Sequence, residues 1–268
     1  MDPNDYKTIE AFVRSFEKVD GLVKKINPDI VIAPMVGAVP FIDVLNIIDG
    51  EFPNDKVEYV PASNKVHKVS DVLRGAFENL IREKVPEGGK LLSLDEVVSG
   101  NSVQRVYRQF DAARTNYANK RTVETYGEHT DFRDERVRAF RDSVRESIKY
   151  QSVGIVDSRM ERAGKNMAED YLTLVKNKII LPVKTDCIVT MDRADFFPAT
   201  YKTAEDDQGK KIFLPVIDKF DISPKYVDFL ITVAEILGKD RNMVTVKNMG
   251  KIRDSYRFVP ESLREYHK

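Results

Sequence analysis

Hydrophobic residues follow two patterns along this chain. Over residues 5–26, apolar side chains return at every third or fourth position, which predicts an amphipathic helix that ends before Pro28. The same spacing predicts helices over residues 37–48 and 69–84. Short runs of β-branched residues or leucines, bounded by prolines and glycines, predict buried strands at 30–33, 57–60 and 91–94. Strand and helix therefore alternate from residue 30 to about residue 110.

The second half of the chain continues this alternation after a long polar segment. Residues 102–150 are rich in arginine, and the Gly-containing stretch 125–128 divides them, which predicts a helical hairpin rather than a compact crossover. Further strands are predicted at 152–156, 178–183, 187–191 and 212–217, and further helices at 166–175 and 225–237.

Alternating strands and helices favour an α/β fold, in which flanking helices cover a parallel central sheet. We interpret residues 1–268 as one domain. It consists of an N-terminal helix (1–27), a core (28–200) with a helical insertion at about 103–150, and a C-terminal extension (201–268).

Composition narrows the function classes. The 268 residues carry 43 basic and 43 acidic side chains, so a globally basic nucleic-acid binder is disfavoured, and an apolar share of 42% can build a core. The single cysteine, Cys187, excludes an intramolecular disulfide and a cysteine-based metal cluster. The N-terminus lacks the apolar segment of a signal peptide. The longest uncharged run, residues 30–42, is shorter than the roughly 20 residues that span a bilayer. These features predict a soluble cytoplasmic protein with no membrane partner.

The best candidate site lies in the segment LLSLDEVVSGNSV, residues 91–103. Two acids, Asp95 and Glu96, follow an apolar strand, and a short polar loop leads into a helix. Backbone N–H groups of such a loop and the helix N-terminus can hold a phosphate, while the acids can bind sugar hydroxyls or Mg²⁺. A second interpretation stays open, in which Ser102 caps the helix and the two acids are solvated loop residues.

This segment resembles the signature that binds phosphoribosyl pyrophosphate (PRPP) in type I phosphoribosyltransferases. The resemblance covers residues 28–110 well and 150–200 loosely. It implies that Asp95 and Glu96 are the catalytic acids that meet the ribose hydroxyls, with Mg²⁺ as cofactor. The resemblance also assigns two loops. The ribose 5-phosphate loop consists of Ser99, Gly100, Asn101 and Ser102, and the pyrophosphate loop consists of Met35, Val36 and Gly37.

Two departures from the family pattern affect the functional hypothesis. The loop 99–102 is one residue shorter than usual, and apolar Met35 and Val36 stand where the family carries Arg or Lys beside its glycine. Lys65 and Lys68, in the region that would form a mobile hood over the ligand, are candidates to replace the missing charge. The alternative for these lysines is an ordinary solvated loop.

Two later loops add candidates for contacts with the base or hood. Asp157 and Arg159 follow the strand 152–156 and would share an edge of the parallel sheet with Asp95, although a charged surface turn is the alternative. Asp192 and Phe196 follow the strand predicted at 187–191, where related enzymes present an acid and an aromatic ring to a purine. Packing in the core or in a lid is the alternative for Phe196.

The arginine-rich segment has its own interpretation. Residues 105–149 carry eleven basic and eight acidic side chains, a net charge of +3, interleaved with aromatic residues. Such mixtures can bind single-stranded nucleic acid, but intermixed acids favour a solvated hairpin or one that mediates self-association into a homo-oligomer.

Three functional hypotheses follow. The first is a PRPP-binding transferase of nucleotide metabolism, in which a nitrogen base displaces pyrophosphate from the anomeric carbon. The second is a non-enzymatic sensor or effector on the same fold, whose arginine-rich segment contacts a protein or nucleic acid. The third is an α/β domain of unrelated function, with only a capped turn at residues 95–102.

Overall fold

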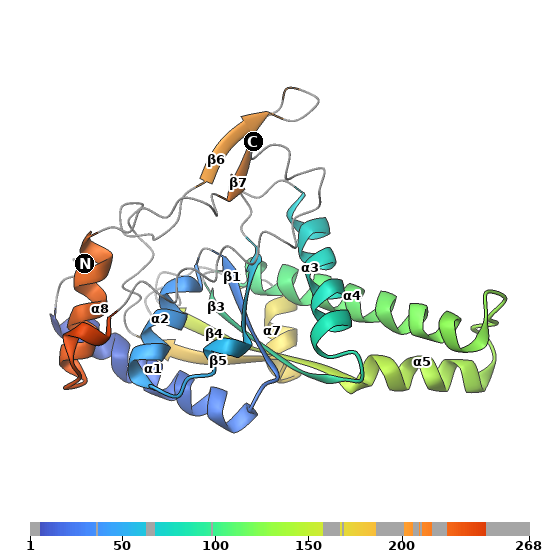
Figure 1. Cartoon of the computed structure of the whole chain (residues 1–268), viewed down its shortest axis with the longest axis horizontal. Helices are drawn as coiled ribbons and strands as arrows, with labels where there is room; N and C mark the ends of the chain where they lie inside the picture. The colour runs from blue at the N-terminus through green and yellow to red at the C-terminus, as the bar shows by residue number, and fades with distance from the viewer. Residues whose placement is uncertain are drawn as a thin grey trace.

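The computed structural model has a five-stranded, all-parallel central sheet with helices on both faces (Figure 1). The expected α/β class is therefore confirmed. The structure describes residues 6–35, 37–62, 68–97, 99–157, 167, 169–185, 201–205, 209, 211–215 and 224–244. Its helices and strands are α1 (Tyr6–Ile26), β1 (Ile30–Met35), α2 (Val39–Ile48), η1 (Asn54–Lys56), β2 (Val57–Pro61), α3 (Val69–Lys84), β3 (Gly89–Val97), α4 (Asn101–Tyr126), α5 (Glu135–Ser147), β4 (Ile148–Asp157), α7 (Glu169–Lys176), β5 (Ile180–Thr185), β6 (Tyr201–Glu205), β7 (Lys211–Pro215), α8 (Pro224–Ile236) and η2 (Arg241–Met243).

Successive side chains of each strand point to opposite faces of the sheet, so the hydrophobic core has two layers. On β1, Val31 and Ala33 belong to the hydrophobic cluster that packs with α1, α2 and α8, whereas Ile30 and Ile32 belong to the cluster under α3 and α4. Such double-sided burial explains why the strands are almost continuously apolar in the sequence. The predicted amphipathic face of α1 is confirmed, because Phe12 and its apolar neighbours are fully buried against the first layer.

The strand order β2-β1-β3-β4-β5 places a topological switch point between β1 and β3. β1 pairs with β2 as far as Met35, but its pairing with β3 ends at Ile32 opposite Ser93. β3 continues beside β4 as far as Val97. β1 and β3 thus stop pairing with each other before their carboxyl ends. In doubly wound sheets, ligands bind outside the carboxyl ends of the strands at this switch point.

A helical hairpin of α4 and α5 connects β3 to β4 (Figure 1). The first half of α4 acts as a crossover helix, since Val106 and Phe110 pack with Tyr150 of β4. Farther along, α4 and α5 extend beyond the sheet as an arm. Gly127, with a φ of 93°, ends α4, and the Asp134 side chain caps α5 by accepting hydrogen bonds from two backbone N–H groups. The segment is therefore a hairpin and a crossover at once, whereas the sequence interpretation treated the two as alternatives.

The ends of several elements differ from the sequence predictions, and two differences matter for the fold. β3 runs through Asp95 and Glu96, which were expected just after the strand, because its pairing with β4 continues to Val97. The predicted strand 212–217 corresponds to β7, which forms a separate antiparallel pair with the unforeseen β6. The strand predicted at 187–191 lies outside the described residues.

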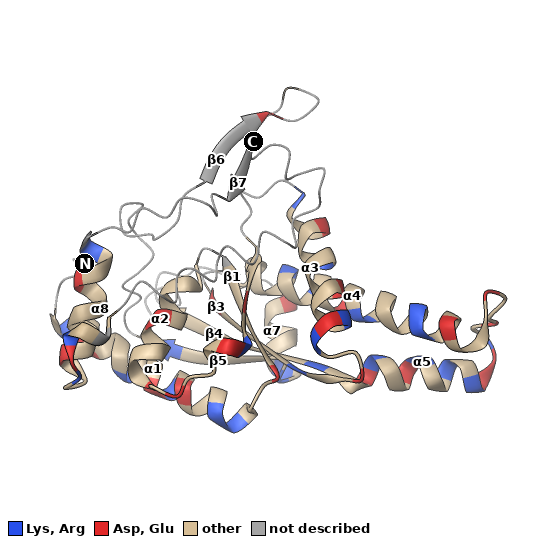
Figure 2. Ribbon diagram, in the orientation of Figure 1, with Lys and Arg blue, Asp and Glu red and all other residues tan. Residues whose placement is uncertain are grey.

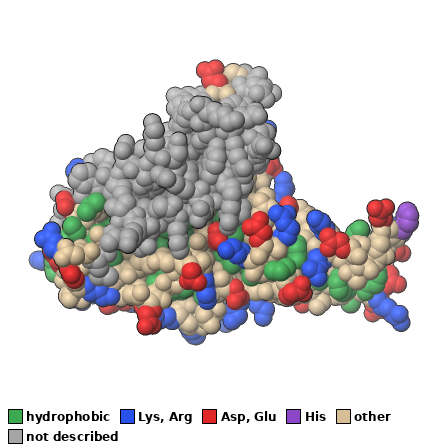
Figure 3. Space-filling model, viewed as in Figure 1, with side chains coloured by type: hydrophobic (Ala, Val, Ile, Leu, Met, Phe, Trp, Pro, Cys, Tyr) green, Lys and Arg blue, Asp and Glu red, His purple; other side chains and the backbone are tan. Residues whose placement is uncertain are grey.

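Charge is intermixed over the described surface. Basic and acidic side chains alternate along the α4–α5 arm (Figure 2), and the visible face of the arm shows the same mixture (Figure 3). This pattern agrees with the small net charge of the segment. Among the described helices, none combines the length and apolar character needed to cross a membrane.

Candidate ligand site at the carboxyl edge of the sheet

The junction between β3 and α4 is tied together by the carboxyl group of Asp95. The Ser102 hydroxyl donates a hydrogen bond to Oδ2 of Asp95 (3.1 Å), and the Glu96 backbone N–H donates to Oδ1 (2.9 Å). Asp95 is only 6% exposed. These bonds hold the start of α4 against the end of β3, beside the β1–β3 switch point. We call Asp95, Ser99, Gly100, Asn101 and Ser102 the carboxyl-edge site.

Gly100 makes the tight turn into α4. Its φ of 83° is left-handed, a region that residues with a side chain rarely adopt. A Cβ atom added here would lie 2.7 Å from Cβ of Tyr171, on α7. The glycine is therefore required twice, for its backbone conformation and for the close approach of α7.

The start of α4 offers backbone N–H groups to an anion. The positive end of this 26-residue helix lies at the carboxyl edge of the sheet, and its first N–H groups suit an anion. Ser99 is half-buried and Asn101 is exposed, so both can present polar groups to a ligand. The Ser102 hydroxyl, by contrast, is already bonded to Asp95.

Burial controls the ionisation of Asp95. Loss of solvation raises its pKa from 3.8 to about 7, although the hydrogen bonds from Ser102 and Glu96 and the positive charge of Arg105 act in the opposite direction. A carboxyl group with such a pKa exchanges its proton near neutral pH. Near this pH it can accept hydrogen bonds when ionised and donate one when protonated.

Arg105 is a site residue that the sequence analysis missed. It lies one turn into α4, and its Nη2 donates to the backbone carbonyl oxygen of Ala62, just after β2 (3.1 Å). Burial lowers the pKa of Arg105, while the charge of Asp95 raises it. The side chain thus brings a cation to the carboxyl edge, near the strand end where Met35 and Val36 supply none. Its position one turn after Ser102 was a signal available in the sequence.

The two expected catalytic acids point in opposite directions. Successive side chains of an extended strand lie on opposite faces, so Asp95 faces α4 while Glu96, which is half-buried, faces the other layer. Within the described residues, no cluster of three or more acidic, histidine or cysteine side chains could hold a metal ion. As placed, these two acids do not form a shared Mg²⁺ site, and the binding of Mg²⁺ stays a prediction.

Two buried serines and a tyrosine form a polar strip beside Asp95. Ser93 of β3 pairs in register with Ser152 of β4, on the same face as Asp95 and Tyr150. Burial raises the pKa of Tyr150, and the hydroxyls of Ser93 and Ser152 act against this shift. None of the three hydroxyls makes a hydrogen bond of standard geometry within the described part of the chain. In the sequence, Ser93 and Ser152 could have been noticed as polar residues within otherwise apolar strands.

Other predicted site residues are only partly placed. Gly37 is half-buried in the turn after β1, where the Ala38 N–H donates to the Pro34 carbonyl oxygen (3.0 Å). Lys68 is exposed at the start of α3, with a left-handed φ of 47°. The side chains of Met35 and Asp157, and the residues Val36, Lys65, Arg159, Asp192 and Phe196, lie outside the described residues.

Nothing matches this chain among the family models, curated proteins and solved structures with which it was compared. The carboxyl-edge site therefore rests on its own geometry. The parallel sheet brings the ends of β1, β3 and β4 to one edge, and β1 and β4 flank β3. The structure describes all four residues of the predicted phosphate loop, 99–102. They lie at the carboxyl edge of the sheet, where doubly wound sheets bind their ligands.

Proposed function

We propose that this chain binds a ribose phosphate, PRPP or a close relative, at the carboxyl-edge site. The observation that carries the proposal is the hydrogen-bonded Asp95–Ser102 junction beside the β1–β3 switch point. The geometry supports a ligand with an anionic group, and the resemblance of residues 91–103 to the phosphoribosyltransferase signature supplies the ribose phosphate.

Each part of the site has a role in this proposal. The α4 N-terminus and the polar groups of Ser99 and Asn101 hold the phosphate, because helix N–H groups carry partial positive charge. Asp95 accepts from or donates to a ribose hydroxyl. Ser102 keeps the Asp95 carboxyl oriented, and Arg105 contributes positive charge beside it.

The transfer reaction is the enzymatic form of this proposal. A nitrogen base attacks the anomeric carbon, the bond from that carbon to the pyrophosphate oxygen breaks, and pyrophosphate leaves with the electron pair. This chemistry depends on positioning and on stabilising the charge of the leaving group, not on a side-chain nucleophile. A site made of backbone amides, hydroxyls and one arginine suits it.

A sensor or effector role is the second candidate, and the β1 end of the site favours it. Residues 30–42 carry no charged side chain, so this edge offers no side-chain cation of its own to a leaving pyrophosphate. The α4–α5 arm begins at the site and extends away from the sheet (Figure 1). In this role, a partner protein or nucleic acid binds the arm when the ligand occupies the site.

Calorimetric titration of the full chain with PRPP, with and without Mg²⁺, tests binding. We expect saturable heat for the wild type and at least about tenfold weaker binding for Asn101→Ala, which removes an exposed side chain. Asp95→Asn probes the ribose contact with little change of shape. Asn119→Ala, farther along α4, is the matched control. Absence of heat with the wild type, or equal affinities for Asn101→Ala and Asn119→Ala, contradicts the proposal.

Turnover separates the two candidate roles. The chain is incubated with labelled PRPP and a panel of purine and pyrimidine bases, and released pyrophosphate is measured. Release above background that depends on a base establishes the transferase. Saturable PRPP binding without turnover for any base supports the sensor.

A further inference from the structure

A groove between α3 and α4 lies away from the carboxyl-edge site. Its volume is about 300 Å³, at the lower end of the range for small-molecule sites. The groove includes Pro86, in the turn that leads into β3, and therefore lies near the amino end of that strand. The carboxyl-edge site is at the opposite end. We call this space the α3–α4 groove.

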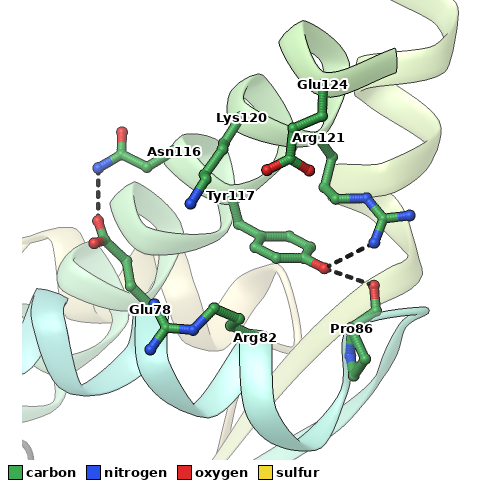
Figure 4. A pocket seen from close by; sticks show the side chains of 8 residues that line it. All are labelled: Glu78, Arg82, Pro86, Asn116, Tyr117, Lys120, Arg121 and Glu124. Carbon is green, nitrogen blue, oxygen red and sulfur yellow. Dashed lines mark hydrogen bonds between the residues drawn. The ribbon is translucent and has the colours of Figure 1, made fainter.

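Basic side chains from two helices converge on the groove. Arg82 comes from α3, whereas Lys120 and Arg121 come from α4 (Figure 4). Glu78 and Glu124 also line it, so its formal charge is +1. Glu78 already accepts a hydrogen bond from the Asn116 amide (2.8 Å), and Arg121 is paired with Glu87 (3.4 Å). Arg82 donates to the side chain of Asn79 with Nη2 (2.6 Å), so a ligand would share this guanidinium with Asn79. Glu124 is the second acid in the lining of the groove.

Tyr117 organises the floor of the groove. Its hydroxyl donates to the Pro86 carbonyl oxygen (2.9 Å) and accepts from Nη1 of Arg121 (3.4 Å). Figure 4 shows the ring between Arg82 on one side and the α4 side chains Lys120 and Glu124 on the other. These bonds anchor the ring and one cation before any ligand arrives, and both supporting elements are helices. Such preorganisation reduces the entropic cost of binding.

The chemistry of the lining selects a ligand with two kinds of group. Guanidinium and ammonium groups together suit a phosphate, because arginine offers paired donors and lysine a compact charge. The Glu124 carboxylate is an acceptor only, and it suits a hydroxyl donor next to the phosphate. The Tyr117 ring offers an apolar surface for the body of the ligand.

We propose that the α3–α4 groove binds a small sugar phosphate, with the phosphate on Arg82 and Lys120 and a sugar hydroxyl on Glu124. This site is separate from the carboxyl-edge site and does not depend on the function proposed there. A metabolite bound here would lie against the helix that carries the carboxyl-edge site at its other end.

Hydrogen–deuterium exchange of the full chain with ribose 5-phosphate tests the proposal. The sugar phosphate should protect the segments 78–86 and 116–124. Lys120→Gln and Arg82→Gln should each raise the concentration for half-maximal protection of these segments about tenfold, the loss expected for one charge-assisted contact. Arg138→Gln, an exposed cation on α5, is the matched control and should leave that concentration unchanged.

The readout by segment keeps the two sites distinct. Protection confined to residues 99–105 overturns the groove proposal and leaves the proposed function standing. Protection of the groove in Asn101→Ala supports the groove independently of the carboxyl-edge site. Equal protection of the groove by inorganic phosphate, or equal half-maximal concentrations in Lys120→Gln and Arg138→Gln, overturns the assignment to a sugar phosphate.

Discussion

Gly100 carries the most specific steric requirement at the carboxyl-edge site. We expect Gly100→Ala to lower the free energy of unfolding by about 2–4 kcal/mol, because left-handed backbone costs about 1–2 kcal/mol and the new Cβ would meet Tyr171. Gly238→Ala is the control. Its φ of 64° is also left-handed, but an added Cβ there has no neighbour within 4 Å.

Urea unfolding followed by circular dichroism measures both variants. The difference between them isolates the contact with Tyr171 from the backbone strain. If Gly238→Ala lowers stability as much as Gly100→Ala, the close packing of α7 against the loop is not what requires the glycine.

A second buried carboxyl group, Asp43, lies in the layer formed by α1, α2 and α8. The Tyr226 hydroxyl of α8 donates a hydrogen bond to it. Burial raises the pKa of Asp43 to about 7, and the Tyr226 bond acts in the opposite direction, which means that the bond favours the ionised carboxylate. Tyr226→Phe should therefore destabilise the protein by about 1–3 kcal/mol, with a larger loss at pH 8 than at pH 5.

Thermal and urea unfolding at the two pH values check this dependence. Tyr126→Phe removes an exposed hydroxyl and should have little effect at either pH. A loss for Tyr226→Phe that is the same at pH 5 and pH 8 contradicts the preference of the bond for ionised Asp43.

At the scale of elements, Asp111 joins α4 to α5. Its Oδ1 accepts from Nη2 of Arg114 (2.6 Å) and from Nη2 of Arg145 (2.7 Å), and Arg114 also donates to the Ile148 carbonyl oxygen (3.2 Å). Asp111→Asn should destabilise by about 1–2 kcal/mol, because the pair is partly exposed and solvent weakens it.

The expected effect is local. Hydrogen exchange should accelerate in α5 while the central sheet keeps its protection, since the arm extends beyond the sheet. Asp142→Asn is the control, because Asp142 pairs with its neighbour Arg141 on the same helix. Equal acceleration in both variants would show that Asp111 does not join the helices.

Elements with strong periodicity could be predicted from the sequence, and their ends could not. The apolar positions of α1 and the apolar runs of β1 and β3 are local signals. By contrast, β3 continues through Asp95 and Glu96 because it pairs with β4, more than 50 residues later. That pairing directs the two acids to opposite faces. The sequence thus indicated a polar loop at 99–102 between a strand and a helix, but not how strand geometry separates Asp95 from Glu96.

At the scale of the whole molecule, the C-terminal half contributes to both the core and the site. Tyr226 and Phe229 of α8 are fully buried in the layer with α1 and α2, and the ring centroids of Phe229 and Phe12 are 5.9 Å apart. Tyr171 of α7 packs against the Gly100 turn. No local pattern could predict these contacts, because each joins segments that are far apart in the sequence.

The two buried carboxyl groups, one in each layer, predict the pH dependence of stability. The pKa values of Asp43 and Asp95 are about 7 in the folded protein, compared with 3.8 as the ordinary value. Between these values the folded state binds more protons than the unfolded state, so both groups make the free energy of unfolding fall as pH rises from about 4 to about 7. Asp49, whose pKa is lowered, acts in the opposite direction.

The double variant Asp43→Asn/Asp95→Asn removes both titrations. Its free energy of unfolding, measured in urea from pH 4 to pH 8, should fall less with rising pH than that of the wild type, by at most about 4 kcal/mol for each carboxyl group. The contribution of Asp49 is lost only as the pH falls below about 4, so the Asp49→Asn variant should follow the wild type from pH 5 to pH 8. Parallel curves for wild type and double variant would mean that neither carboxyl group holds its proton in the folded protein. Asp95 would then be ionised throughout this pH range, and the ligand that we propose would bring hydroxyl donors rather than phosphate oxygens to this carboxylate.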